Sequence, residues 1–170
     1  MQILRLKKLL TPDRLSNASA AEGRVLYTQL CATCHSLFGE GGKIGPEITG
    51  ADRRNLDYLL ENILDPSSTV PDAYRVSVVN LKDNRVLTGI LLTLNERAIT
   101  LQTLTEKLII EHKEIETITQ STLSMMPDGL LETVSESDLL NLTAYLMSPQ
   151  QVALKNVTQT EPKPAGARTK

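Results

Sequence analysis

The chain has 170 residues, of which 41% are hydrophobic and 22% charged, and this suits one ordinary globular domain or a small domain with an insertion. A net charge of -2 and dispersed Lys and Arg residues give no electrostatic reason to expect nucleic acid as a partner. No stretch approaches the roughly 20 apolar residues of a membrane span, and basic residues interrupt the opening MQILRLKKLL before a signal-peptide core can form.

Residues 1–18 are predicted to form an N-terminal extension. Ile3, Leu6 and Leu10 are spaced as on one face of a helix, and the segment ends at Thr11-Pro12-Asp13. This pattern favours a packed helix or an interdomain connector over a membrane anchor.

A helix is predicted from residue 19 onwards. Ser19 and Glu22 have the spacing of a capping box. One apolar helical face then runs into Cys31 and consists of Ala21, Val25, Leu26 and Leu30. The motif that follows is therefore expected at the end of a helix.

That motif is Cys31-Ala32-Thr33-Cys34-His35, the Cys-x-x-Cys-His signature of covalent haem attachment. Two cysteines one helical turn apart can each form a thioether with a haem vinyl group, and the histidine that follows binds the iron as an axial ligand. The chain has no Trp and one Phe, so its core has few large planar side chains, and a porphyrin would fill the space that such side chains usually occupy. The sequence predicts one covalently bound haem c.

Three other interpretations of the cysteine pair are open. A structural zinc site needs four ligands, but the chain has two Cys and two His, and His35 adjoins Cys34 too closely to share one tetrahedron. A thioredoxin-like dithiol would follow a strand of a βαβ unit, whereas a predicted helix precedes this motif. The third interpretation is a cysteine pair without special chemistry.

Residues 38–50 are too rich in glycine for a helix or a strand, and they lack the residue order of a phosphate-binding loop. Glycines allow the backbone to approach a ligand closely, and Pro46 fixes the direction of its own carbonyl. The sequence therefore predicts a loop pressed against a flat group.

A second helix is predicted over residues 53–64, where one apolar stripe precedes Asp65-Pro66 and consists of Leu56, Leu59, Leu60, Ile63 and Leu64. The hydrophobic period then changes from 3.6 to 2. Five short β-branched runs follow, over residues 74–81, 86–93, 98–104, 107–110 and 115–119. Strands so closely spaced are expected to curl into a small antiparallel barrel or sandwich of the SH3-like or Sm-like kind.

The last predicted helix has Ser135 as its N-cap, Asp138 at its third position, and an end before Pro149. Its inward side chains are Leu139, Leu142, Tyr145 and Leu146. Residues 149–170 have no hydrophobic period and are predicted to form a linker or a disordered tail.

The second axial position of such a haem separates electron transfer from ligand binding and catalysis, according to whether it is filled or open. The residue before a proline adopts an extended backbone, which restricts the direction of the Met126 side chain ahead of Pro127. We therefore favour Met126 as the ligand, with Met125 as the alternative, although methionines are also common core fillers. His112 lies in a polar turn and is expected to be exposed.

These motifs together resemble a known family. CATCHSLFGEGGKIGPEITG, then YLLENILDP, a run of strands with GIL, and finally SMMPDGLLETVSESDLLNLTAYL are similar to the haem-binding cytochrome c domain of large planctomycete and verrucomicrobial proteins. The resemblance covers about residues 19–148, and several separated motifs occur in the same order.

The resemblance implies a class I cytochrome c-like fold. In that fold a glycine and an aromatic residue of the first helix cross a leucine and an aromatic residue of the last, which this chain has in Gly23, Tyr27, Leu142 and Tyr145. It also implies that the Pro46 carbonyl accepts the proton of His35 and so fixes the tautomer of that ligand. The family usually has leucine before its ligand methionine, where this chain has Met125.

The predicted fold class is therefore α+β. A mainly helical cytochrome c-like domain covers residues 19–148 and is interrupted at residues 74–119 by a small antiparallel β-barrel. This insertion accounts for the 95 positions (126 - 31) between Cys31 and Met126, more than a small monohaem cytochrome needs. An insertion is tolerated when its two ends lie close together.

The leading hypothesis is a monohaem electron carrier, not an enzyme, in which His35 and Met126 stay bound while the iron changes oxidation state. Its partner would be a redox protein or a fused dehydrogenase domain. Covalent haem attachment in bacteria takes place outside the cytoplasm, so we expect a periplasmic or otherwise exported protein whose leader lies upstream or has been removed.

Two alternative functions are open. One is a haem-based sensor or a peroxidase-like domain with a labile sixth ligand. His112 is the only other histidine and no arginine lies near the methionine motif, which argues against a distal acid and base pair. The other is a protein-interaction module in which the β insertion binds a partner and the haem is structural.

Overall fold

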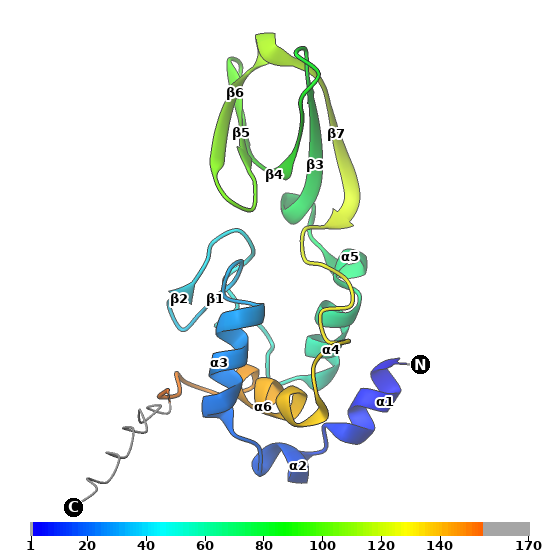
Figure 1. The fold of residues 1–170 in the computed structure, drawn as a ribbon, viewed down its shortest axis with the longest axis vertical. Helices are drawn as coiled ribbons and strands as arrows, with labels where there is room; N and C mark the ends of the chain where they lie inside the picture. Colours follow the sequence, from blue (N-terminus) through cyan, green and yellow to red (C-terminus); the bar gives the residue numbers. More distant parts are fainter. Residues whose placement is uncertain (1, 155–170) are drawn as a thin grey trace, which may run out of the picture.

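The computed structural model of the chain describes residues 2–154, so that the end of the predicted tail, residues 155–170, lies outside the described residues. Figure 1 shows two parts stacked along the long axis, a bundle of short helices at one end and a β-sheet at the other. Each part has its own buried cluster of apolar side chains. The predicted α+β class is confirmed.

The packed helix expected near the N-terminus is present as two short helices, α1 (Gln2–Leu9) and α2 (Pro12–Ser16). Thr11 is the N-cap of α2, with Pro12 as the first helical residue. Leu6 and Leu10 are buried in the helical cluster. This segment therefore packs on the helical part.

Helices α3 (Ala20–Leu30) and α6 (Glu136–Leu146) form the centre of the helical part. Both begin at serine N-caps that the sequence predicted, Ser19 and Ser135. The Ser19 hydroxyl accepts a hydrogen bond from the Glu22 amide. This amide lies in the first turn, where backbone amides have no acceptor within the helix.

The two helices cross at the positions expected of a class I cytochrome c-like fold. At Gly23 they approach so closely that a Cβ atom would collide with the Asn141 carbonyl. Beside this contact the rings of Tyr27 and Tyr145 pack at 59°, with their centroids 5.4 Å apart. Leu142 is also buried on this face of α6.

The apolar face predicted for α3 is partly wrong. Val25 is 43% exposed, whereas Gly23 and Tyr27 are the buried residues of the helix. A hydrophobic pattern marks large apolar side chains, but the contact between α3 and α6 depends on the missing side chain of Gly23. The buried face is therefore shifted from the predicted one, although Leu26 and Leu30 still pack against the helical cluster.

Helices α4 (Leu56–Leu64) and α5 (Pro66–Thr69) lead from the bundle towards the sheet (Figure 1). Helix α4 begins three residues later than predicted because Asn55 is its N-cap. The Asn55 side chain accepts hydrogen bonds from the amides of Asp57 and Tyr58. Helix α5 follows α4 directly, although the sequence pattern did not indicate a helix there, and the 3-10 turn η1 (Asp72–Tyr74) connects it to the sheet.

The five predicted strands are all present and pair in the antiparallel order β6-β5-β4-β3-β7. Their bounds are β3 (Arg75–Leu81), β4 (Val86–Leu94), β5 (Ala98–Gln102), β6 (Lys107–Glu111) and β7 (Ile115–Ser124). Strand β7 thus continues beyond its predicted end at residue 119. The buried cluster of the sheet consists of Val79, Leu81, Ile99, Leu101 and Ile110.

The predicted closed barrel is not confirmed. Among the described strands, β6 and β7 are the two edges of the sheet and do not pair with each other. The register shifts where β4 pairs with β5 and where β3 pairs with β7, and such irregularities bend a sheet. At Gly89 the backbone of β4 lies so close to the Gln102 carbonyl that a Cβ atom would collide with it. The sheet is curled but open (Figure 1).

The two ends of the sheet region lie side by side. Arg75 at the start of β3 pairs with Ser124 at the end of β7, so the chain enters and leaves the sheet at one place (Figure 1). An insertion with adjacent ends disturbs its host domain little. The chain continues from β7 directly into Met125 and Met126.

Candidate functional site

The Cys-x-x-Cys-His motif forms a tight turn at the C-terminal end of α3, as the sequence predicted. Cys31 is the C-cap of that helix, and its amide donates a hydrogen bond to the Tyr27 carbonyl at 2.8 Å. The amides of Cys34 and His35 both donate to the Cys31 carbonyl, at 3.1 and 2.9 Å. The turn therefore gathers the two thiols and the imidazole at one end of α3.

The imidazole of His35 is oriented by a backbone carbonyl. Its Nδ1 donates a hydrogen bond to the Pro46 oxygen, 2.9 Å away. A carbonyl oxygen can only accept, so Nδ1 carries the proton and Nε2 carries the lone pair. The Tyr27 hydroxyl in turn donates to the carbonyl of His35 at 2.7 Å. His35 thus has a fixed tautomer in which Nε2 can bind a metal.

The glycine-rich loop packs against the motif itself. The Gly42 amide donates to the Ala32 carbonyl at 2.7 Å, and the Gly45 amide donates to the Cys34 carbonyl at 2.9 Å. A Cβ atom on Gly45 would lie 2.8 Å from Cε1 of His35. The sequence predicted a loop pressed against a flat group, and in the structure that flat group includes the imidazole of the chain's own histidine.

The loop begins with a small hairpin that the sequence did not predict, β1 (Ser36–Leu37) and β2 (Glu40–Gly41). Its turn places Phe38 at a φ of 55° and Gly39 at a φ of 82°. Glycine adopts this left-handed region without strain, whereas a residue such as Phe rarely does. The hairpin reverses the chain directly after the motif.

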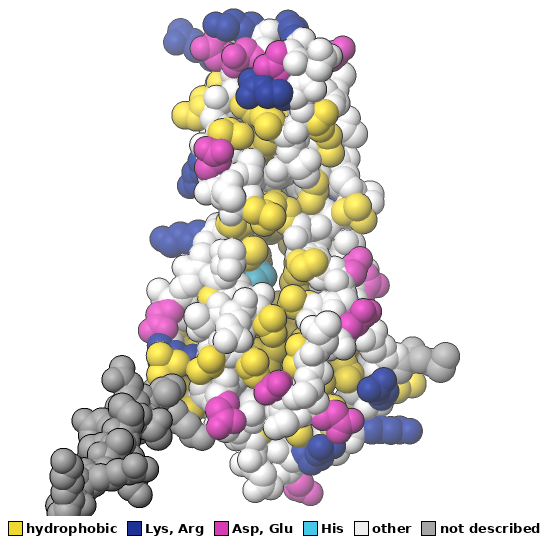
Figure 2. Space-filling model, viewed as in Figure 1, with side chains coloured by type: hydrophobic (Ala, Val, Ile, Leu, Met, Phe, Trp, Pro, Cys, Tyr) yellow, Lys and Arg dark blue, Asp and Glu magenta, His cyan; other side chains and the backbone are white. Residues whose placement is uncertain are grey.

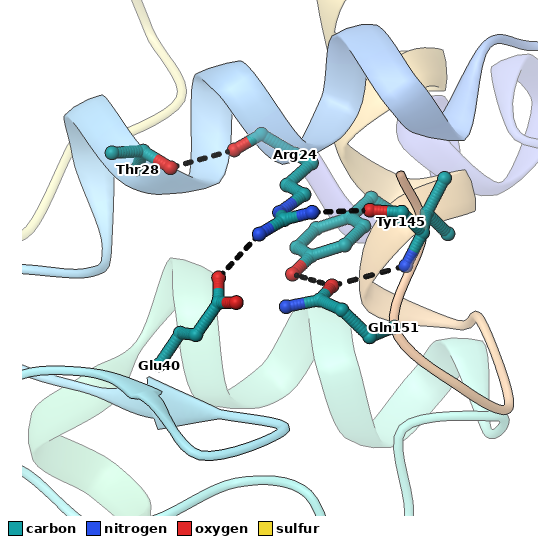
Figure 3. Close-up of polar contacts among 6 residues, drawn as sticks. Arg24, Thr28, Glu40, Tyr145 and Gln151 are labelled. Atoms are coloured by element: carbon teal, nitrogen blue, oxygen red, sulfur yellow. Dashed lines mark hydrogen bonds and ion pairs between the residues drawn. The ribbon is translucent and has the colours of Figure 1, made fainter. Parts of the chain in front are cut away.

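A polar network holds this hairpin and the residues after α6 against α3 (Figure 3). Arg24 donates hydrogen bonds to the Glu40 carboxylate and to the Val152 carbonyl, both at 2.5 Å. The Tyr145 hydroxyl and the Val152 amide both donate to the side-chain oxygen of Gln151, at 2.8 and 3.0 Å. The first residues of the predicted tail therefore pack on the domain.

An apolar cavity lies beside His35, between the helical part and the sheet. Figure 2 shows hydrophobic side chains around a hollow in the middle of this face, with a histidine inside it. The walls come from segments far apart in the chain and include Cys31, Cys34, Pro46, Leu59, Ile63, Tyr74, Ile90, Met125, Met126, Leu131 and Leu142. Residues far apart in the sequence thus share one apolar enclosure with the imidazole.

The two thiols that face this cavity are free and protonated. Burial raises the pKa of Cys31 to about 12, and the charge of Cys34 adds to the shift. Burial also raises the pKa of the Cys34 thiol. A reactive dithiol of the thioredoxin kind has a lowered pKa instead. Within residues 2–154 no group of three or more His, Cys, Asp or Glu side chains is arranged to hold a metal ion, which argues against the zinc interpretation.

The structure places both candidate methionines in the wall of this cavity and places the second histidine elsewhere. Met125 and Met126 follow β7, are partly buried, and share the cavity with His35. His112 is exposed in the turn η2 (His112–Glu114), where its Nε2 bonds with the Asn95 carbonyl at 2.7 Å. Its predicted exposure is therefore observed.

Arg53 is a cavity residue that the sequence analysis missed. It is 7% exposed, and its guanidinium donates hydrogen bonds to the carbonyls of Thr49, Leu146 and Ser148. The guanidinium also lies 4.9 Å from the centre of the Phe38 ring. Burial lowers the pKa of Arg53. No arginine lies near the methionine motif in the sequence, but in space this one lines the same cavity.

The residues around the cavity fit a covalently attached haem. A porphyrin is flat and largely apolar, and it needs thioether bonds to two cysteines and an imidazole nitrogen for its iron. The cavity offers apolar walls, two free thiols one turn apart, and a histidine whose Nδ1 is already engaged by a carbonyl. Methionine sulfur, the other common axial ligand, is present in the same wall.

Comparison with known families agrees with this geometry, because residues 20–83 match the family model of cytochrome c. This match supports a cytochrome c domain in this segment, with covalent haem c as its cofactor and electron transfer as its role. The matched segment contains the Cys-x-x-Cys-His turn, the glycine-rich loop and α4, and it ends just after β3. The methionine motif and α6 follow beyond it.

Other comparisons add no argument about function. No curated protein matches the chain at a significant level. Among solved structures, a crystal structure of the pleiotropic translational regulator Hfq is similar at 17% identity, over 38% of this chain and 88% of that chain. Its TM-score of 0.27 is too low to indicate a shared fold.

Proposed function

We propose that the chain carries a single haem, attached through Cys31 and Cys34, and transfers one electron at a time with His35 and Met126 as its axial ligands. The observation that carries this proposal is the shared cavity. Both thiols, the imidazole and the methionine sulfur line one apolar enclosure, although 91 positions (126 - 35) separate the two proposed iron ligands.

Each residue has a separate task in this proposal. A bound haem would supply an iron that can be ferrous or ferric, and methionine ligation would favour the ferrous state relative to a second histidine. Cys31 and Cys34 fix the position of the porphyrin, which keeps it in place during electron transfer. Pro46 holds the proton of His35 on Nδ1, so that Nε2 stays directed to the iron.

Met126 is preferred to Met125 because its backbone is more restricted. Pro127 disfavours the helical region for the residue before it and so limits the directions that the Met126 side chain can take. An axial ligand must keep its sulfur on the iron through both oxidation states, and a restricted backbone helps it do so. Met125 lacks a following proline.

Two single substitutions test this assignment. We expect Met126→Ala to abolish the weak far-red absorption band that reports sulfur ligation of ferric haem, because no thioether then reaches the iron. Met125→Ala is the matched control and should keep the band, since it removes an equal side chain from the neighbouring position. The opposite pattern would assign the ligand to Met125.

An absorption spectrum with and without carbon monoxide tests the closed sixth position. The protein is made with the cytochrome c maturation machinery and reduced, and we expect the ferrous spectrum to stay unchanged on adding carbon monoxide. A shifted spectrum would favour the alternative of a sensor or peroxidase-like domain with a labile ligand. Extraction with acidified organic solvent is the parallel test of attachment, and loss of the pigment to the solvent would contradict thioether bonds to Cys31 and Cys34.

The proposed setting is an exported protein that exchanges electrons with a redox partner or with a fused dehydrogenase domain. Cytochrome c domains are typically exported, because haem is attached to them outside the bacterial cytoplasm. None of the helices in the described part of the chain has the length and apolar composition of a membrane span. Fractionation of cells that express the chain behind an export signal tests this, and haem attached to protein retained in the cytoplasm would contradict it.

A further inference from the structure

The segment that leads into the proposed methionine ligand is held by two successive serine hydroxyls. The amide of Met126 donates a hydrogen bond to Oγ of Ser124 at 3.1 Å. The amide of Ser124 donates in turn to Oγ of Ser67 at 3.2 Å. Ser67 belongs to α5 and lies 57 positions earlier in the chain, so the second bond connects distant segments.

These bonds restrict the backbone of Met126 from the N-terminal side. A serine hydroxyl that accepts the amide two residues further on forms a compact turn and replaces a backbone partner. Pro127 restricts the same residue from the C-terminal side. Met126 therefore has its amide bonded and its ψ limited, although its side chain has three rotatable bonds of its own.

The residues that hold this turn in place belong to β3 and α5, not to the segment that contains Met125 and Met126. Arg75 pairs with Ser124 across β3 and β7, which fixes the end of β7 at the place where the chain leaves the sheet. Pro66 is buried, starts α5, and lines the same cavity as the methionines. Ser67 directly follows it, so the hydroxyl that receives the Ser124 amide is attached to the cavity wall.

We infer that Ser124, anchored by Ser67, is the positioning residue for the axial sulfur of Met126. This inference rests on the proposed ligation by Met126 and adds the residues that keep the sulfur in place. A thioether is a neutral and weak ligand, so the fraction of time that it stays bound depends on how far the free loop can move away. Bonds that hold the backbone near its bound position reduce the conformational entropy gained when the sulfur leaves the iron.

The test measures how easily imidazole displaces the sulfur from ferric iron in the haem-loaded protein. The readout is the imidazole concentration at which half of the far-red band is lost. We expect Ser124→Ala to lower this midpoint about tenfold, the effect of losing roughly one hydrogen bond. Ser67→Ala should lower it about threefold, because this variant loses the hydrogen bond from the Ser124 amide but keeps the bond between Ser124 and the Met126 amide. Ser124→Thr keeps the hydroxyl and should remain close to the unchanged protein.

Ser121 provides a matched control on the same strand. Its Oγ accepts the amide of Leu123 at 3.0 Å, the same turn three residues earlier, but it does not line the cavity. Ser121→Ala should leave the midpoint unchanged. An unchanged midpoint in Ser124→Ala, or an equal fall in Ser121→Ala, would overturn the inference while leaving ligation by Met126 intact.

Failure of the proposed ligation gives a different result. In that case the unchanged protein lacks the far-red band, or Met126→Ala retains it, and both the ligation and the inference are wrong. If Ser124→Ala does not accumulate with haem, the pair of Ser67→Ala and Ser124→Thr carries the test. A normal midpoint in Ser67→Ala together with a lowered one in Ser124→Thr would then contradict the inference.

Discussion

Gly45 leaves no room for a side chain beside the imidazole of His35. A methyl group there would lie 2.8 Å from Cε1 of the ring, so the ring must tilt and strain its hydrogen bond to Pro46. We expect Gly45→Ala to lower the thermal unfolding midpoint of the haem-loaded protein by about 5 °C, because overpacking costs about 1–3 kcal/mol. The decrease is measured by circular dichroism on heating.

Gly50→Ala is the control for this substitution. A Cβ atom on Gly50 would have no atom within 4 Å, and the φ of Gly50 is outside the left-handed region. Its unfolding midpoint should therefore stay unchanged. Equal losses for the two variants would mean that the loop backbone, and not the contact with the imidazole, explains the effect.

Single residues differ in how far their roles could be predicted. The bond between His35 and Pro46 was expected from the family resemblance and is present. Arg53 was missed because its partners are backbone carbonyls, which every residue has and no motif records. Whether Met125 or Met126 binds iron stays a prediction.

At the crossing of α3 and α6 the two helices leave no room for an added side-chain atom. A methyl group on Gly23 would collide with the Asn141 carbonyl and lie 2.8 Å from Cβ of Tyr145. We expect Gly23→Ala to lower the free energy of unfolding by about 2–3 kcal/mol, since the two helices must separate. Denaturant unfolding of the haem-loaded protein measures the loss.

Gln29→Ala is a suitable comparison on the same helix, because Gln29 is exposed. Alanine is the better helix former, so this variant should be neutral or slightly stabilising. A similar loss in both variants would show that the effect comes from α3 itself and not from its contact with α6.

The type of each main element could be predicted, but the closure of the sheet could not. Hydrophobic alternation identified all five strands between β3 and β7, and serine caps identified the starts of α3 and α6. Closure depends on where the register shifts and on whether the edges β6 and β7 meet. Alternation along one strand contains no information about either, because it describes faces and not edges.

At the scale of the whole molecule, the chain enters and leaves the sheet at neighbouring residues, so a short turn can replace the sheet. Replacing residues 76–123 by Asn-Gly would join Arg75 to Ser124 through a two-residue turn, which suits strand neighbours. We expect covalent haem and the far-red band to survive. The reduction potential should fall by about 60 mV, a tenfold change in the one-electron equilibrium, because Ile90 no longer covers the cavity and water stabilises ferric iron.

A redox titration monitored by absorption measures this change. Loss of covalent haem on removing the sheet would mean that the sheet is part of the haem domain's core and not an insertion. If the variant instead keeps its spectrum and potential but no longer binds a redox partner, the sheet is an interaction module, the alternative left open by the sequence.

The side-by-side placement of Arg75 and Ser124 has a consequence for the stability of the iron centre. While the sheet is folded, it holds Arg75 next to Ser124. The helical part therefore does not bear the entropic cost of bringing together the two ends of a flexible loop of about 50 residues. If heat or denaturant unfolds only the sheet, Met126 follows a long flexible segment, and the bond between its sulfur and the iron becomes weaker. The colour of the ferric protein would then report the melting of a part of the molecule that supplies no ligand.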